Sequence, residues 1–131
     1  MGMYFFLTSN SFKNVYPLNS AFDFTVDIPS LQPAKYEIAL MEIAWTLSDE
    51  NVELPTLCVF CDIATHNSFV KNSLLPLLRI VDEPAVFNIP YYIEMKEEYV
   101  NRIRIYMCNV NGEKLTIEPS FLRCTLHIRK Q

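Results

Sequence analysis

Apolar and polar side chains alternate along much of this chain, which has 131 residues, and a period of two is typical of β-strands. In segments 22–28, 102–110 and 121–129, every second residue is apolar and most residues between them are polar or charged. This pattern predicts strands that turn one face toward a core and the other toward solvent. In the last segment, the residues predicted to face inward are Leu122, Cys124, Leu126 and Ile128.

Segment 36–45 is a longer apolar run, and its sequence is compatible with two structures. A helix is possible because Ala, Leu, Met and Glu favour helices. We predict a central strand instead, because Pro33 precedes the run and the neighbouring segments have strand patterns. Further strands are predicted over 57–63, over 74–81 with an interruption at Pro76, and over 86–93 as a short edge segment.

The chain contains only two glycines but eight prolines. Phosphate-binding loops need residues that adopt positive φ close to a ligand, so this composition excludes P-loop and dinucleotide-binding folds. Prolines disfavour helix interiors and central strands, and here they indicate connections or sheet edges. Asn111-Gly112 favours a tight hairpin turn, from which residues 113–117 are predicted to return as a strand.

Together these segments predict one domain of the all-β class over residues 1–131. We expect an antiparallel β-sandwich, single and jelly-roll-like, with about eight strands and short connections. Met1-Gly2 stands before a second methionine, and we interpret it as a remnant of an expression tag.

Acidic residues outnumber basic ones, with 15 Asp and Glu against 11 Lys and Arg, and the formal net charge is −4. A protein that binds nucleic acid needs a basic surface that displaces counterions from phosphates. A solvated strand face explains the basic residues near the C-terminus at least as well, and we therefore expect no nucleic-acid partner. These residues are Arg102, Arg104, Arg123, Arg129 and Lys130.

No run of residues approaches the roughly 20 apolar positions that span a bilayer, so we expect no membrane partner. The apolar segment 3–7 is too short for a signal peptide and lacks a basic lead. There is also no Asn-x-Ser/Thr sequon. The chain is therefore expected to be made inside the cell and not secreted.

Two of the four cysteines, Cys58 and Cys61, have the CxxC spacing of half a zinc site or of a redox pair. A zinc site needs a second pair of ligands nearby, whereas Cys108, Cys124 and the two histidines are scattered in the sequence. Cysteine is often buried even when it is free. We favour four reduced core thiols in an intracellular protein and no metal site, with a zinc or redox pair as the alternative.

The sequence contains no set of residues that would form a catalytic site. His127 is predicted to face solvent on the last strand, and His66 lies in a polar loop, so neither histidine needs a chemical role. Asp23 and Asp27 share a strand face, but four residues of strand separate them by roughly 13 Å, too far for a glycosidase pair. We predict no enzyme activity, no cofactor and no small-molecule substrate.

Both ends of the chain resemble a family of viral proteins. Residues 7–11, 17–21, 24–29 and 36–43 look like the opening "LPSNSS…FPNNT…F.V.LP…WEVAL.EI" found in proteins of Polinton/Maverick elements and adintovirus-like viruses. Residues 103–129 are similar to the close of that family, "I.I.I.D..G…F..G…V.LHFRR".

The chain departs from this family pattern at three positions and across its middle. Thr8 stands where the family has proline, Tyr36 where it has tryptophan, and Ile128 where it has phenylalanine. Residues 47–90 do not match the pattern. The matching motifs consist of polar turns and strands. The proposed role in a virion comes from this resemblance, whereas the β-rich, non-catalytic interpretation comes from the residues themselves.

The resemblance implies a structural virion protein, either a penton-type minor capsid subunit or a vertex-associated jelly roll. Such a subunit would reside in the virion and contact other copies of itself, with a pentamer favoured and a trimer possible, as well as other capsid proteins. An alternative from a different class is a soluble β-sandwich module that recognises a host protein or a glycan.

Exposed aromatic side chains are the candidates for contact under either hypothesis. A capsid subunit would pack the aromatics of segment 4–16 between copies. A recognition module would instead present an aromatic platform around Tyr91, Tyr92 or Trp45. The candidate interface residues are Tyr4, Phe5, Phe12, Tyr16, Trp45, Tyr91 and Tyr92.

Overall fold

The computed structural model describes residues 2–47, 49 and 52–131, and the regular structure of these residues consists of β-strands. No helix in this part of the chain could cross a membrane. In chain order, the strands are β1 (Gly2–Thr8), β2 (Asp23–Leu31), β3 (Tyr36–Thr46), β4 (Leu57–Cys61), β5 (Ser68–Val70), β6 (Ser73–Leu75), β7 (Leu77–Val81), β8 (Ala85–Val86), β9 (Ile93–Glu94), β10 (Val100–Asn109) and β11 (Phe121–Lys130).

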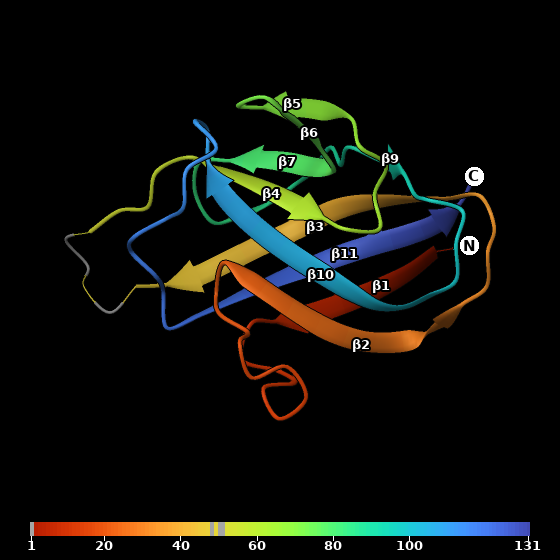
Figure 1. Cartoon of the computed structure of the whole chain (residues 1–131), viewed down its shortest axis with the longest axis horizontal. Helices are drawn as coiled ribbons and strands as arrows, with labels where there is room; N and C mark the ends of the chain where they lie inside the picture. The colour runs from red at the N-terminus through yellow and green to blue at the C-terminus, as the bar shows by residue number, and fades with distance from the viewer. Residues whose placement is uncertain (1, 48, 50–51) are drawn as a thin grey trace.

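Two antiparallel sheets lie face to face and form a sandwich (Figure 1). Sheet I has the order β1-β11-β3, and both β8 and β9 pair with the other edge of β3. Sheet II has the order β2-β10-β4-β7. In Figure 1, β10 and β2 of sheet II lie in front of sheet I. The remaining pair, β5-β6, forms a separate hairpin.

The strand pairs are nested, as in a jelly roll. β1 pairs with β11, β2 with β10, β3 with β8 and β9, and β4 with β7, so the chain resembles one long hairpin folded over on itself. The prediction of an all-β, jelly-roll-like sandwich is confirmed. The structure has more strands than the predicted number because it includes the β5-β6 hairpin and the two-residue strands β8 and β9.

The core consists of the side chains that the two sheets turn toward each other. The inward-facing residues predicted for β11 are all buried, and Leu122, Leu126 and Ile128 have no exposed surface. Sheet II contributes fully buried residues from the opposite side, including Phe24 and Ile105. Removing this apolar surface from water is the main favourable contribution to folding.

β3 is the central strand that we predicted over 36–45, and not a helix. It pairs with β11 along one edge and with β8 and β9 along the other. Ile38 and Ile43 belong to the main core, and Ala39, which points to the other face, is also completely buried. Because both faces are covered here, apolar residues follow one another and the simple alternation is lost.

The prediction that Asn111-Gly112 forms a hairpin turn from which residues 113–117 return as a strand is wrong. β10 already pairs with β2 and β4, so residues 113–117 have no free edge of β10 to join, and they belong to the connection that leads to β11. The turn is held by Asn109, whose Oδ1 accepts hydrogen bonds from the N–H groups of Asn111 and Glu113. Within the turn only Gly112 has positive φ, at 76°, whereas the predicted turn type needs two such residues.

Prolines divide two of the predicted strands. Pro76 separates β6 from β7, and Pro90 lies between β8 and β9. β6 pairs with β5, and this hairpin packs over the outer face of sheet II (Figure 1). It covers a second apolar cluster whose buried members are Cys58, Phe60 and Val70.

Gly2, which we interpreted as part of a tag remnant, is the first residue of β1 and pairs with Arg129. A Cβ atom at this position would overlap the imidazole ring of His127, so the ring occupies the space that a side chain at position 2 would need. Met1 lies outside the described residues.

We expect Leu126→Ala to lower the free energy of unfolding by about 2–5 kcal/mol, because it leaves a cavity between the two sheets. Urea denaturation followed by fluorescence measures this change. Leu18→Ala is the matched control: Leu18 is 92% exposed, so its truncation should change the stability by less than about 0.5 kcal/mol. Equal losses in the two variants would contradict the core described here.

Candidate interaction surface

The predicted interface residues occupy separate parts of the molecule. Tyr4, Phe5 and Phe12 line one groove, and Tyr16 lies in the adjoining loop. The remaining candidates do not form a common platform with one another, because each contacts a different element; they are Trp45, Tyr91 and Tyr92.

The groove lies between β1 and β2, which are the edge strands of the two sheets on the same side of the sandwich (Figure 1). Its volume is about 340 Å³. β1 contributes Tyr4 and Phe6, which are 57% and 78% exposed, and Phe12 projects from the loop with a positive φ of 58°. Large exposed apolar side chains beside a groove indicate a contact surface.

The loop over residues 9–22 connects β1 to β2 and is held by its own polar side chains. The amide of Asn19 is buried; its Nδ2 donates to the carbonyl of Thr25 at 2.8 Å, and its Oδ1 accepts from the N–H of Thr25 at 2.9 Å. The buried hydroxyl of Ser9 accepts a hydrogen bond from the N–H of Leu122 at 2.8 Å. The loop is therefore a defined structure that joins both sheets.

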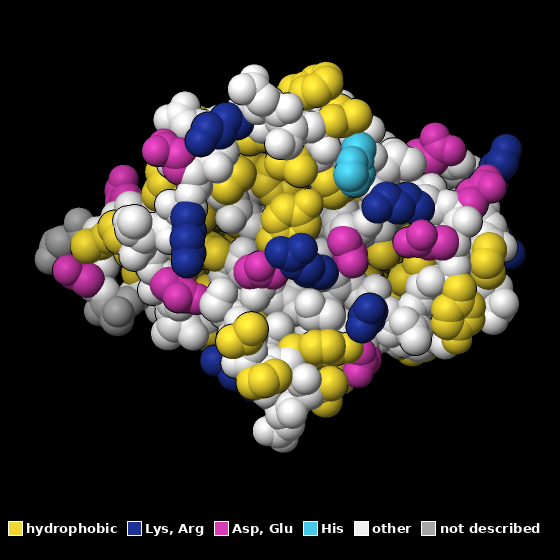
Figure 2. All heavy atoms as spheres, viewed as in Figure 1, with side chains coloured by type: hydrophobic (Ala, Val, Ile, Leu, Met, Phe, Trp, Pro, Cys, Tyr) yellow, Lys and Arg dark blue, Asp and Glu magenta, His cyan; other side chains and the backbone are white. Residues whose placement is uncertain are grey.

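The same loop presents apolar side chains that our sequence analysis missed. Val15 is 59% exposed and Leu18 is 92% exposed, and Figure 2 shows hydrophobic side chains on the lower projection, where this loop lies. The Tyr16 hydroxyl donates to Oδ1 of Asp27 at 2.6 Å and ties the loop to β2. An apolar residue inside a polar turn motif does not belong to a strand that would turn it toward the core. This feature of the sequence could have indicated that Val15 and Leu18 are exposed.

On the outer face of sheet I, His127 lies at the centre of a cluster of aromatic and charged side chains. The ring of Tyr4 stacks on His127 with centroids 4.4 Å apart, and the Tyr92 hydroxyl hydrogen-bonds to Nδ1 of His127 at 2.7 Å. The guanidinium of Arg129 lies 3.5 Å from the centre of the Tyr92 ring, and its Nε donates to Glu37 at 2.5 Å. Both the ring and the hydroxyl of Tyr92 therefore make contacts within the protein.

Tyr91 lies on the opposite side of its segment, against β7. The guanidinium of Arg79 is 4.3 Å from the centre of the Tyr91 ring and 3.8 Å from that of Phe87, and it donates to the carbonyl of Ile89. Tyr91 remains 59% exposed, so its ring is fixed by a cation and still accessible.

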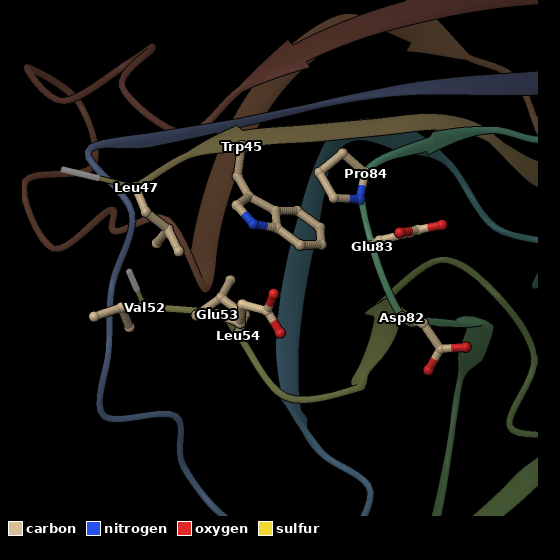
Figure 3. Close-up of a pocket in the computed structure, with 8 residues that line it drawn as sticks. All are labelled: Trp45, Leu47, Val52, Glu53, Leu54, Asp82, Glu83 and Pro84. Atoms are coloured by element: carbon tan, nitrogen blue, oxygen red, sulfur yellow. The ribbon is translucent and has the colours of Figure 1, made fainter. Parts of the chain in front are cut away.

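Trp45 packs against the main core and lines a cavity of about 290 Å³ at one end of the sandwich. Figure 3 shows the indole between Pro84 and Leu54, whereas the carboxylates of Asp82 and Glu83 point away from the ring. The hydroxyl of Thr56 donates to one oxygen of the Asp82 carboxylate. In this position Trp45 closes the end of the core.

The structure places Cys58 and Cys61 on opposite faces of β4, so the two thiols of the CxxC sequence do not converge. Cys61 faces the core, close enough to Cys124 for electrostatic interaction, and Cys58 lies opposite Cys108 on β10. Burial raises the pKa of all four thiols, to about 11 for Cys108 and about 12 for Cys124. The described part of the chain contains no group of three or more His, Cys, Asp or Glu residues that could hold a metal ion.

The basic residues near the C-terminus are divided between the two sheets, and Arg104, Arg123 and Arg129 each lie beside a carboxylate. On sheet II, Arg104 forms a two-pronged ion pair with Asp23, with both N–O distances at 2.9 Å. On sheet I, Arg123 lies 3.9 Å from Glu42. The expected absence of a nucleic-acid partner stays a prediction.

Comparison with known proteins found no family that matches this chain and no curated protein similar enough to count as a relative. The functional interpretation therefore depends on the surface described above and on the resemblance at the two ends of the chain.

We expect Asn19→Ala to lower the free energy of unfolding by about 1–3 kcal/mol, because it leaves the backbone groups of Thr25 without partners. Chemical denaturation measures this loss. Asn10→Ala is the matched control in the same loop, since Asn10 is exposed. The role assigned to Asn19 is wrong if the two substitutions have the same effect.

We also expect stability to depend on the protonation of His127. Burial and the charge of Arg129 lower the pKa of His127, so the unfolded chain takes up this proton more readily than the folded one. The stabilisation is present above about pH 6.5, the ordinary histidine value, and is lost as the pH falls through the lowered value.

Urea denaturation between pH 5 and pH 8 measures this dependence. His127→Gln should reduce the slope of stability against pH, whereas His66→Gln, in an exposed loop, should keep the His127 contribution. An unchanged slope in His127→Gln would show that the cluster does not perturb this histidine.

Proposed function

We propose that this chain is a structural virion protein, a penton-type minor capsid subunit or vertex-associated jelly roll of a Polinton/Maverick or adintovirus-like element. The observation that carries the proposal is the apolar surface formed by β1 and the loop over residues 9–22, at one side of a jelly-roll sandwich. Jelly rolls occur in capsid proteins but also in lectins and cupins, so the fold alone does not assign the role.

The exposed side chains on this surface are large and apolar, and the backbone that carries them is held by hydrogen bonds. Phe6 and Leu18 are 78% and 92% exposed, yet they lie on a paired strand and on a loop held by Asn19. Keeping such side chains in water is unfavourable, and burying each one contributes about 1.5–3 kcal/mol. A surface that is ordered before binding also loses little conformational entropy on association, which favours assembly.

The motifs behind the family resemblance lie where this surface is built. Residues 7–11 contain Ser9, which binds Leu122, and residues 17–21 contain Asn19. The polar-turn motifs thus correspond to the side chains that shape the loop. This correspondence supports a family role for the loop, and the proposal extends it to contacts among capsid subunits.

The proposed subunit contacts further copies of itself and other capsid proteins in the virion. A pentamer is the favoured number from the resemblance, with a trimer as the second possibility. In either ring, each copy would place the apolar loop against a neighbour, where burial contributes about 25 cal/mol per Å² before the cost of association.

The alternative function, a module that recognises a host protein or glycan, has narrower support. It predicted one aromatic platform, whereas Tyr92 is bound to His127 and Trp45 closes the core. What favours it is Tyr91, whose exposed ring is held by Arg79. Loss of glycan or receptor binding in Tyr91→Ala, with particle incorporation unaffected, would favour this alternative.

The test of the virion role is to quantify the chain in purified particles of its source by mass spectrometry. We expect a fixed copy number per particle. Combining Val15→Ser with Leu18→Ser should lower incorporation at least about tenfold, because burial of two apolar side chains is lost. The control combines Val86→Ser with Ile89→Ser, which are exposed elsewhere. Absence of the chain from the particles would overturn the proposal.

A further inference from the structure

A sandwich of two open sheets has four edges, and each edge strand carries unpaired backbone groups that can accept a foreign strand. Here the edges are β1 and β8 with β9 in sheet I, and β2 and β7 in sheet II (Figure 1). Proteins usually protect such edges with charges, prolines, bulges, short strands or covering loops. Three of these edges carry such protection, and β1 does not.

The edge of β2 is blocked by the loop that precedes it. The outward-facing backbone groups of Thr25 both bind the amide side chain of Asn19, which takes the place of a neighbouring strand. The N–H and carbonyl of Asp23 bind the carbonyl and N–H of Ser20 in the same way. A second chain could pair with β2 only after displacing this loop.

The other two edges are protected by different devices. β8 and β9 have two residues each, with Pro84 and Pro90 beside them. β7 begins after Pro76, has a register shift opposite β4, and carries Arg79, which binds the segment that follows. The carbonyl of Leu77 on β7 accepts a hydrogen bond from the side chain of Asn67.

Apart from the carbonyl of Thr8 at its end, which accepts a hydrogen bond from the N–H of Ser11, β1 has none of these devices. Its register with β11 runs without a shift from Gly2 to Thr8, and its sequence contains no charge and no proline. The N–H of Ser9 binds the carbonyl of Leu122, so in the alternating pattern of an antiparallel pair the groups of Phe5 also face β11. The backbone groups of Tyr4 and Phe6 therefore face outward, and no partner for them is found in the described residues.

We propose that β1 pairs antiparallel with β1 of a second copy of this chain, about a two-fold axis at Phe5. In this register Tyr4 of each copy lies opposite Phe6 of the other, and their outward N–H and carbonyl groups form the hydrogen-bonded pairs. The four exposed rings become cross-strand aromatic neighbours, which stabilises antiparallel pairing. Sheet I then continues through the contact into the sheet I of the second copy.

The protection of the other edges indicates which strand of a second copy pairs with β1. The described strands of a second copy offer no other open edge, so among them a strand-to-strand contact between copies is β1 with β1. The segment is uncharged, so pairing with itself brings no like charges together. Such an isologous contact closes after two copies. It therefore differs from the proposed ring contact and does not depend on the virion role.

Sedimentation velocity over a range of protein concentrations tests the contact. The unmodified chain should form a dimer. Phe6→Pro should raise the dissociation constant at least about tenfold while leaving the monomer folded, because it removes an N–H that faces away from β11. Phe6→Lys should act similarly by placing a charge on the edge. Val86→Lys is the matched control on another exposed strand residue and should still dimerise.

Hydrogen exchange at single amides provides a test that does not rely on a variant. The amides of Tyr4 and Phe6 should become protected as the protein concentration rises, whereas the amide of Phe5, bonded to β11, should be protected at every concentration. A chain that stays monomeric, or a Phe6→Pro variant that still dimerises, would overturn this contact. The virion role is tested separately, through the loop residues Val15 and Leu18, which lie outside β1.

Discussion

The pairing of β11 with both β1 and β3 is the interaction on which the rest of this structure depends. It brings the two ends of the chain side by side, and β11 carries the fully buried Leu122, Leu126 and Ile128 into the core. Among the described strands β1 has no other partner, and an isolated pair of strands would be unstable without the core beneath it. Once β11 lies between β1 and β3, nesting places β10 between β2 and β4.

This nesting also decides where the molecule can meet other molecules. It places β1 and β2 on the same side of the sandwich, at the outer ends of their sheets. The loop over residues 9–22 connects these strands and blocks β2 through Asn19, but it leaves β1 open and exposes Leu18. An open strand edge and an apolar loop thus lie next to each other on one side of the molecule.

The same fold determines the surroundings of the side chains that could take part in chemistry, namely the cysteines and His127. Strand alternation places Cys58 and Cys61 on opposite sides of β4, and burial raises the pKa of both thiols. His127, predicted as a solvated residue, is half-buried between Tyr4 and Tyr92. Its neighbours are aromatic rings and an arginine, which restrict the imidazole and lower its pKa.

The sequence by itself determined the fold class and several of the long strands, because the alternation of side chains is a local property of each segment. Segments 22–28, 36–45 and 121–129 became β2, β3 and β11. Tyr4 and Phe12 are exposed as expected, whereas Phe5, expected to be exposed as well, is partly buried against the core. Only the tertiary structure decided which strands pair, and therefore which edges and rings stay free. Residues 113–117 form no strand because β10 has no free edge. The hydroxyl of Tyr92 is bound within the protein because His127 lies beside it. Both outcomes depend on contacts between residues far apart in the chain, which no local pattern encodes.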